Sequence, residues 1–296
     1  MTPAASAARR DRHRLAIVFV VGLAVLVLEV AGAAVTGSLA LLADAGHVAS
    51  DVAGIGLALA AIWLAGRPPS ETRTYGWYRA EILAALVNAV ALLVLAAFIL
   101  WRAWERLGTE PSIETGTMLV VALIGAGANA ASLWLLREAQ ARSLNMRGAY
   151  LEVLGDLLGS AAVVVAALVI ALTGITAADA VASVVIALLI VPRAWRLLRE
   201  ALDVLLEAAP RGMDMEDVRR HLLATPGVED VHDLHAWTLT SGLPVLSAHV
   251  VVDETVPSVE MLDRLCGCLS DDFDVEHSTI QLEDRDRRLI EQQAHR

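Results

Sequence analysis

Six apolar runs, each long enough to cross a lipid bilayer, constrain this chain more than any other feature of its sequence. A membrane-spanning helix needs about 20 predominantly apolar residues, because each residue advances the helix by roughly 1.5 Å across a hydrocarbon core about 30 Å thick. Such runs lie near residues 14–35, 39–65, 80–101, 115–136, 149–173 and 178–198. We therefore expect a polytopic α-helical membrane protein with six transmembrane helices.

The overall composition agrees with a membrane protein. Of the 296 residues, 56% are hydrophobic and 19% are charged, and the mean hydropathy is +0.58. Soluble domains carry about 25% charged residues. The first run is longer than the apolar core of a signal peptide, which has about 7–15 residues, so we expect it to be retained as a span.

The arginine residues indicate how the spans are oriented. Cytoplasmic loops of membrane proteins carry an excess of Lys and Arg. Arginines cluster before the first run, around the loop after the second, in the loop after the fourth, and at the end of the sixth: Arg9, Arg10, Arg12, Arg14, Arg67, Arg73, Arg79, Arg137, Arg142, Arg147, Arg193, Arg196 and Arg199. This pattern predicts a bacterial-type inner-membrane protein with both termini in the cytoplasm. Arg102 and Arg106 break the pattern, and we expect Glu105 to neutralise them locally.

A second, acidic segment begins after Pro210. Residues 210–296 hold 18 acidic residues and eight arginines, a net charge of −10, whereas residues 1–209 carry a net charge of −1. Periodicity and turn residues predict a helix, two strands, a helix and a strand, over residues 214–224, 228–239, 245–252, 257–269 and 276–282. This order indicates a small two-layer α+β domain. The charged residues 285–296 lack an apolar period, and we expect a flexible tail there.

Four ionisable residues lie inside two of the apolar runs. His47 and Asp51 are four residues apart in the second run, as are Glu152 and Asp156 in the fifth, so each pair shares one helix face. A charge at the bilayer centre costs roughly 2.5–3.5 kcal/mol, and such groups therefore face one another, a cavity or an ion. One imidazole and three carboxylates form a full ligand set for tetrahedral Zn²⁺. These four residues are the predicted intramembrane metal site.

The charge of this ligand set suggests what the site does. Three carboxylates carry more negative charge than a divalent cation neutralises, so protons and metal compete for the same groups. This competition predicts metal–proton exchange if the site opens to one side of the membrane at a time. Asp44, three residues before His47, is expected either to act as a proton relay or transient outer ligand, or to cap local polar groups near the outer surface, and the capping role is favoured.

Two other functions are less compatible with the sequence. A proton-coupled carrier of an organic solute often has helices broken by Gly or Pro at mid-membrane, but here the only proline within the runs is Pro192, near the end of the sixth. A membrane metalloenzyme needs an open metal position and a separate base. We therefore predict no enzyme activity, no catalytic residues and no bound organic cofactor.

Five polar side chains of the acidic segment are candidate ligands for cytoplasmic metal sites: His232, His235, His249, His277 and Glu283. Two interpretations remain open, a solvent-facing polar sheet surface and a regulatory metal-binding surface. Cys266 and Cys268 lie two residues apart on a predicted helix and point to different faces, so we interpret both as structural.

Six segments resemble the cation diffusion facilitator family, in its zinc-type branch: ADAGHVASD, YGWYRAEILAALVNA, RGAYLEVLGDLLGS, LDVLLEAAP, VHDLHAWTLTSG and HSTIQLE. The resemblance implies a homodimeric exporter that exchanges divalent transition metals for protons, with Zn²⁺ first and Co²⁺, Cd²⁺, Fe²⁺ or Mn²⁺ as further candidates. Its implied partners are a second copy of the chain, membrane lipid and the metal ions, with no nucleic acid. It implies a cytoplasmic tail (1–13), a six-helix transport domain (14–209) and a ferredoxin-like cytoplasmic domain (210–284) that binds metal and joins the protomers.

The resemblance also concerns particular residues. The transport site of the family falls on His47, Asp51, Glu152 and Asp156. Zinc-type members usually have histidine where this chain has Glu152, which leaves the metal open and makes a metal-sensing homologue without transport the alternative function. The resemblance further suggests a charge pair between the third and sixth spans, joining Arg79 to Glu207 or Asp203.

Overall fold

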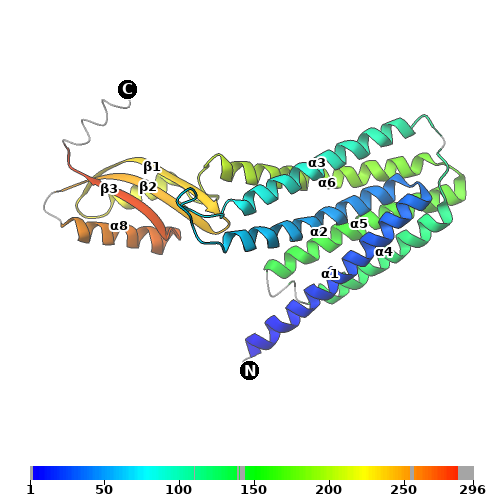
Figure 1. Cartoon of the computed structure of the whole chain (residues 1–296), viewed down its shortest axis with the longest axis horizontal. Coiled ribbons are helices and arrows are strands. Elements are labelled where there is room, and N and C mark those ends of the chain that lie inside the picture. The colour runs from blue at the N-terminus through cyan, green and yellow to red at the C-terminus, as the bar shows by residue number, and fades with distance from the viewer. Residues whose placement is uncertain (1–2, 110, 139, 141–143, 254–256, 286–296) are drawn as a thin grey trace. The chain divides into compact units, whose positions relative to one another are not determined.

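The computed structural model describes residues 3–109, 111–138, 140, 144–253 and 257–285. Six long helices come first in the chain, followed by a small α+β domain (Figure 1). The long helices are α1 (Pro3–Thr36), α2 (Leu39–Ala65), α3 (Ala80–Arg106), α4 (Thr115–Leu136), α5 (Leu144–Thr173) and α6 (Ala177–Leu205). The described residues form two compact units, one up to Ala58 with Val87–Leu198, the other Leu59–Leu86 with the residues from Arg199 onward.

The long helices agree with the predicted spans. Within the described residues, five are long and apolar enough to cross a membrane: α1 from Arg14, α3, α4, α5 from Met146, and α6. α2 has 27 residues, as many as α3, and is the sixth. Helix α1 already begins at Pro3, so the segment predicted as a tail before residue 14 is helical from that point.

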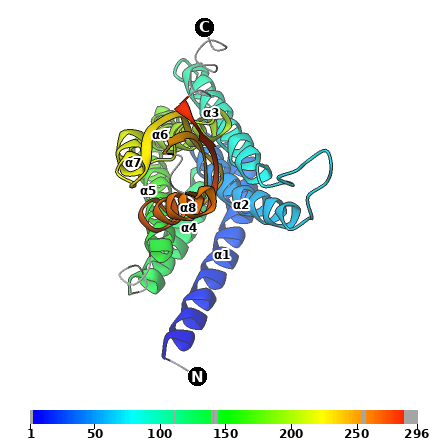
Figure 2. The same ribbon diagram turned by 90° about the vertical axis from the view of Figure 1, so that its left-hand side faces the viewer.

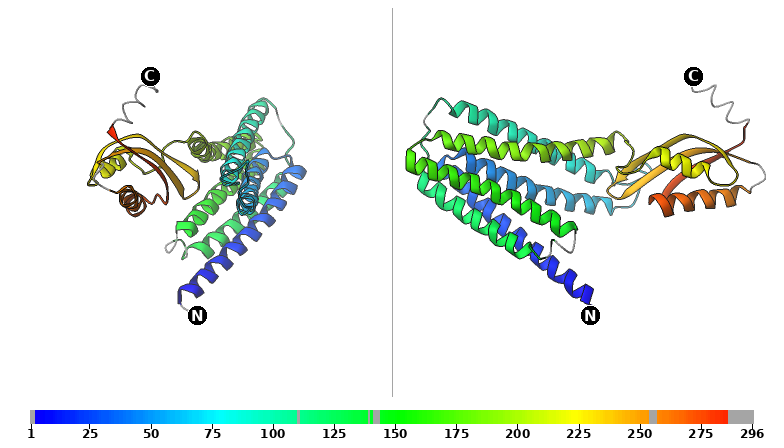
Figure 3. Two further views of the ribbon diagram at one scale, coloured as in Figure 1. Left: turned by 60° about the vertical axis from the view of Figure 1, so that its left-hand side comes forward. Right: turned by 180° about the vertical axis from the view of Figure 1, so that it is seen from behind.

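Small side chains allow close packing of the helices in the first unit. Alanines supply much of its buried core, among them Ala40, Ala96, Ala122, Ala166 and Ala187. α1, α4 and α5 lie side by side, and α3 lies beside α6 (Figures 1 and 3). Many large apolar side chains point outward instead. This distribution suits a bundle whose surroundings are lipid, because small residues let helix backbones approach while lipid solvates the large side chains.

Asp179 of α6 holds the beginning of α2. Its carboxylate accepts hydrogen bonds from the hydroxyl of Ser38 at 2.5 Å and from the backbone amides of Leu39 at 2.8 Å and Ala40 at 3.1 Å. The first amides of a helix have no partner within the helix, so an acceptor from another element satisfies them. Asp179 is completely buried, which ties α2 to α6 at this end of the bundle.

The carboxylate of Asp179 also pairs with one of the two arginines that break the positive-inside pattern. Arg106 of α3 lies 2.9 Å from Asp179, whereas Arg102 pairs with Glu105 at 2.8 Å. The expectation that Glu105 neutralises both arginines is therefore right for Arg102 and wrong for Arg106.

The second unit contains the predicted α+β domain. Its elements are α7 (Met215–Leu223), β1 (Val228–Thr240), β2 (Leu243–Val252), α8 (Ser258–Phe273) and β3 (His277–Glu283). The strand order is β1-β2-β3, with β1 antiparallel and β3 parallel to β2. The two helices lie on the same side of the sheet, giving two layers (Figure 2). The expected ferredoxin-like αββαβ architecture is confirmed.

Alternation along β2 separates the two faces of the sheet. Leu246, Ala248 and Val250 are almost fully buried against Leu222 of α7 and Leu265 of α8. Because successive side chains of a strand point to opposite faces, His249 lies on the face away from the helices. The sheet therefore presents a polar surface that the hydrophobic core does not use.

Charged contacts join the ends of α3 and α6 within the second unit. Arg79 lies 2.8 Å from Glu207, which matches one of the two predicted pairs. The other candidate, Asp203, instead lies 3.1 Å from Arg211. The first turn of α3 also contacts the sheet, because Glu81 accepts hydrogen bonds from Thr240 and Ser241.

Candidate metal centre

Three of the four predicted intramembrane ligands converge between α2 and α5. Nε2 of His47 lies 3.5 Å from Oδ1 of Asp156 and 3.9 Å from Oδ2 of Asp51. One donor atom from each residue lies within 4.8 Å of the other two. The side chains are only 12–15% exposed. Small side-chain adjustments would bring all three donors to about 2.0–2.2 Å from one Zn²⁺ ion.

The fourth predicted ligand, Glu152, contacts a cation from the protein itself. Its Oε1 lies 2.5 Å from Nη2 of Arg193, and the same nitrogen lies 3.3 Å from Oδ1 of Asp51. Arg193 is inside α6, directly after Pro192. From the sequence, Arg193 was expected only to help orient the chain in the membrane, so its place beside two predicted ligands was missed. The assignment of Glu152 as a metal ligand stays a prediction.

Asp44 belongs to a different polar network, deeper between the helices. Ser160 of α5 donates a hydrogen bond to Oδ2 of Asp44 at 3.1 Å, and Asn129 of α4 donates to Ser160 at 3.3 Å. Asp44 is 2% exposed. The network links α2, α4 and α5, which agrees with the structural role considered for Asp44, and the relay role stays a prediction.

A glycine makes the close approach of α2 and α5 possible. A Cβ atom added at Gly159 would lie 2.4 Å from Oδ1 of Asp44, whereas one added at Gly155 would have nothing within 4 Å. Contacts between heavy atoms at 2.4 Å are strongly repulsive, so a side chain at residue 159 would displace either the carboxylate of Asp44 or the helix itself. Gly159 therefore leaves room for the Asp44 carboxylate between the helices that carry His47 and Asp156.

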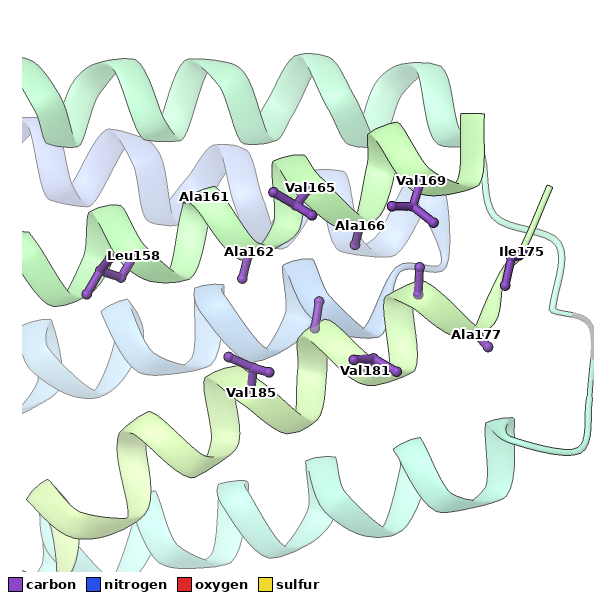
Figure 4. A pocket seen from close by; sticks show the side chains of 12 residues that line it. Leu158, Ala161, Ala162, Val165, Ala166, Val169, Ile175, Ala177, Val181 and Val185 are labelled. Atoms are coloured by element: carbon purple, nitrogen blue, oxygen red, sulfur yellow. The ribbon is translucent and has the colours of Figure 1, made fainter. Parts of the chain in front are cut away.

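An apolar groove between α5 and α6 is chemically unlike the metal centre. It has a volume of about 600 Å³. Leu158, Val165 and Val169 of α5 and Val181 and Val185 of α6 lie along it (Figure 4). None of its lining residues is charged, so the groove offers no ligand to a metal ion.

On the sheet of the second unit, three of the five predicted cytoplasmic candidates come together. Nε2 of His232 lies 3.2 Å from Glu283, and Nδ1 of His249 lies 2.9 Å from the other carboxylate oxygen. His232 and His249 are cross-strand neighbours in the register of β1 and β2. Donor atoms of all three residues lie within 4.8 Å of one another, which suits a metal site.

The remaining two cytoplasmic candidates lie outside this cluster, and their role as metal ligands stays a prediction. Residue His235 lies beyond a register irregularity in β1, opposite Ser247. His277 is at the other end of β3 from Glu283, where its ring contacts that of Tyr75. The alternation of polar and apolar residues along a strand predicts which side chains share a face of the sheet. It does not predict the register between strands, which decides which residues on that face are neighbours.

A further group of possible ligands was not predicted from the sequence. His221 of α7 meets Cys268 and Asp272 of α8, with one donor atom of each within 4.8 Å of the others. The four-residue spacing of Cys268 and Asp272 was the available signal. The partner His221 lies on another helix, where sequence spacing gives no information.

Comparison with known proteins identifies the architecture that carries these groups. A family model of the cation efflux transmembrane domain matches residues 15–206, and a model of the cytoplasmic domain of cation efflux proteins matches residues 210–285. The chain belongs to the cation diffusion facilitator family. As a member of this family it is a multi-pass membrane transporter and not an enzyme. Its cytoplasmic domain is of the family's dimerisation type, which supports a homodimer.

Curated relatives resemble this cation diffusion facilitator over most of its length. The metal cation efflux system protein CzcD of Cupriavidus metallidurans is 47% identical over 87% of this chain and 82% of its own. The zinc transporter ZitB of Escherichia coli is 42% identical over 92% of this chain and 88% of its own. A cadmium, cobalt and zinc/H(+)-K(+) antiporter of Bacillus subtilis is 36% identical over 92% of this chain and 89% of its own.

Proposed function

We propose that this protein exports Zn²⁺ and related divalent transition metals from the cytoplasm in exchange for protons. The observation that carries the proposal is the convergence of His47, Asp51 and Asp156 inside the transmembrane domain of a cation efflux family member. An imidazole nitrogen and carboxylate oxygens suit Zn²⁺, Co²⁺ and Cd²⁺. The names of the relatives, which include zinc, cobalt and cadmium, support the same set of metals.

Arg193 adjusts the charge of the site to that of its substrate. Asp51, Asp156 and Glu152 together carry −3 when ionised, and the guanidinium beside Glu152 and Asp51 adds +1. The resulting charge of −2 is neutralised by one divalent cation. His47, Asp51 and Asp156 thus bind the metal, while Glu152 becomes available as a fourth ligand when it parts from Arg193.

Proton coupling follows from the use of the same groups by both ions. A metal ligand must give up its proton before it binds, and it takes up a proton again after the metal leaves. If His47 and its carboxylate partners face the cytoplasm when they load metal and the outside when they release it, each cycle carries protons inward. The arginine distribution supports this orientation, with both termini in the cytoplasm of a bacterial-type inner membrane.

Metal uptake into inside-out proteoliposomes tests the transport function. With an acidic lumen, the wild type should accumulate Zn²⁺, and Co²⁺ and Cd²⁺ should compete with it. Asp51→Asn and Asp156→Asn should reduce gradient-driven uptake by at least about 100-fold, because each removes a charged ligand while keeping the side-chain size. Glu71→Gln, in the exposed loop after α2, is the control and should transport normally.

Three results would contradict this function. Uptake of Zn²⁺ that ignores the pH gradient would exclude proton exchange. Binding of Zn²⁺ without uptake of Zn²⁺, Co²⁺, Cd²⁺, Fe²⁺ or Mn²⁺ would instead favour a metal sensor that has lost transport. Transport that persists in the presence of EDTA would indicate a proton-coupled carrier of another solute.

A further inference from the structure

Two helices of the cytoplasmic domain bring three different metal-binding groups together. Nε2 of His221, on α7, lies 3.0 Å from Oδ2 of Asp272, on α8. Cys268 is one helical turn before Asp272, and its sulfur lies within 4.8 Å of the other two donor atoms. An imidazole, a thiol and a carboxylate therefore point to one location.

The surrounding contacts hold these groups in position. Leu222, next to His221, belongs to the same hydrophobic core as Leu265 and Leu269 of α8, and all three are fully buried, which keeps the two helices next to each other. The imidazole of His221 meets the ring of Phe273 edge to face, with centroids 5.4 Å apart. A ligand ring that is already oriented loses less conformational freedom when a metal binds.

The chemistry of the donors indicates which ions fit. A thiolate, a carboxylate and a neutral imidazole carry a total charge of −2, which balances one divalent cation. Sulfur and nitrogen ligands favour Zn²⁺, Cd²⁺ and Co²⁺ over Mg²⁺ and Ca²⁺, which prefer oxygen. Burial, followed by the charges of Asp272 and Asp271, raises the pKa of the Cys268 thiol. A bound cation reverses this effect, because the thiol releases its proton to solvent as the sulfur–metal bond forms.

This group is separate from the other two clusters found among the described residues. His249 lies on the opposite face of the sheet from α7 and α8, and the intramembrane cluster of His47, Asp51 and Asp156 contains no sulfur. The side chains of His221 and Asp272 are 48% and 51% exposed, so metal can reach them directly from the cytoplasm. The second cysteine points elsewhere, since Cys266 lies 3.5 Å from the hydroxyl of Ser278 on β3.

We propose that His221, Cys268 and Asp272 form a thiolate-containing site for Zn²⁺, Co²⁺ or Cd²⁺ that loads from the cytoplasm and clamps α7 to α8. Three protein ligands leave one tetrahedral position for water, so the metal exchanges with the cytoplasmic pool. The site does not depend on the transport mechanism, because it shares no ligand with the intramembrane cluster.

Titration of the purified full-length protein with Co²⁺ tests the site directly. A cysteine thiolate bound to Co²⁺ gives a charge-transfer absorption band in the near ultraviolet that nitrogen and oxygen ligands do not produce. The chain has two cysteines, which makes the assignment simple. We expect one such band in the wild type, loss of the band in Cys268→Ser, and an unchanged band in Cys266→Ser, the matched control on the same helix.

Two further variants keep both thiols and test the other ligands. His221→Gln and Asp272→Asn should each weaken Co²⁺ binding, measured from the thiolate band, by at least about tenfold. The proposal is overturned if the wild type lacks the band, if the band follows Cys266, or if neither His221→Gln nor Asp272→Asn changes the affinity. Each of these outcomes is read from the absorption band alone, so it does not depend on whether the protein transports metal. Proteoliposome uptake by the same variants measures transport separately.

Discussion

At the scale of single residues, Arg193 is the side chain that most changes the chemistry expected of the intramembrane site. It lies in α6, which contributes none of the predicted ligands, and it contacts both Glu152 and Asp51. A guanidinium can hold two carboxylates at once with fixed geometry, whereas an ammonium acts as a point charge. Glu152 and Arg193 therefore form one unit and should be considered together.

This pairing predicts the effect of replacing Arg193. Arg193→Gln keeps a polar side chain but leaves the site with one more negative charge, so we expect tighter Zn²⁺ binding by roughly 1–3 kcal/mol and slower release. Isothermal titration and proteoliposome uptake measure the two effects. Arg193→Lys retains the charge and is the control, with a smaller change in affinity.

The double variant Glu152→His/Arg193→Gln extends the test. It replaces both members of the pair, and its effect on affinity should differ from the sum of the two single changes by about 0.5–3 kcal/mol. Additive effects would show that Glu152 and Arg193 act independently, contrary to the contact seen in the structure.

The residue scale also shows what the sequence can and cannot predict. The four-residue spacing placed His47 and Asp51 on one helix face, because helix geometry fixes which residues share a face. The cost of a charge inside the bilayer indicated that Asp156 of another apolar run would meet them. Arg193 was missed because the rotation of α6 about its axis depends on packing between helices. The cluster at Cys268 was missed for the same reason, since its histidine comes from a neighbouring helix.

At the scale of secondary structure elements, Asp179 of α6 caps the beginning of α2, the helix that carries His47 and Asp51. It satisfies two backbone amides of α2 and one hydroxyl, and it also pairs with Arg106. Removal of one partner from a buried ionic network leaves the other groups without compensation. The position of α2, and with it the position of His47, therefore depends on a residue in the first turn of α6 that is not part of the candidate metal site.

We expect Asp179→Ala to lower the free energy of unfolding by roughly 3–5 kcal/mol. Ser38→Ala, which removes one hydrogen bond of the same network, should cost about 0.5–1.5 kcal/mol. Glu105→Ala removes an exposed ion pair from α3 and should change stability by less than about 1 kcal/mol. Denaturant titration of the protein in micelles gives the three values. Equal effects for Asp179→Ala and Glu105→Ala would contradict the role of the buried network.

Element boundaries were predicted closely where capping residues mark them. Asp214 caps α7 at the residue where the predicted helix begins, by accepting a hydrogen bond from the amide of Glu216. Helix α8 continues to Phe273, past the predicted end at Leu269, and stops at Asp274 in a left-handed conformation. Nothing in the local pattern marked that end, because aspartate adopts this conformation less readily than glycine does.

At the scale of the whole molecule, the acidic cytoplasmic domain is expected to join two copies of the chain. Like charges on two such domains repel each other, and divalent cations reduce this repulsion. The cluster of His232, His249 and Glu283 is the site at which metal would act. The predicted tail after residue 285 lies outside the described residues.

The prediction is that Zn²⁺ increases the dimer fraction of the full-length protein at low protein concentration. Native mass spectrometry from micelles measures this fraction with and without a chelator. His249→Ala should weaken the response to Zn²⁺ by at least about tenfold, and His235→Ala, outside the cluster, should respond as the wild type does. A dimer fraction that is independent of Zn²⁺ would show that the cytoplasmic metal does not control assembly.

The contact between Gly159 and Asp44 bears on how a transport cycle proceeds. Residue 159 has little room for more than a hydrogen atom beside the carboxylate of Asp44, because an added Cβ would lie 2.4 Å from Oδ1. If the cycle preserves this contact, we expect α2 and α5 to move together, with His47 and Asp156 at a nearly constant separation. The change of side would then come from the motion of the neighbouring helices.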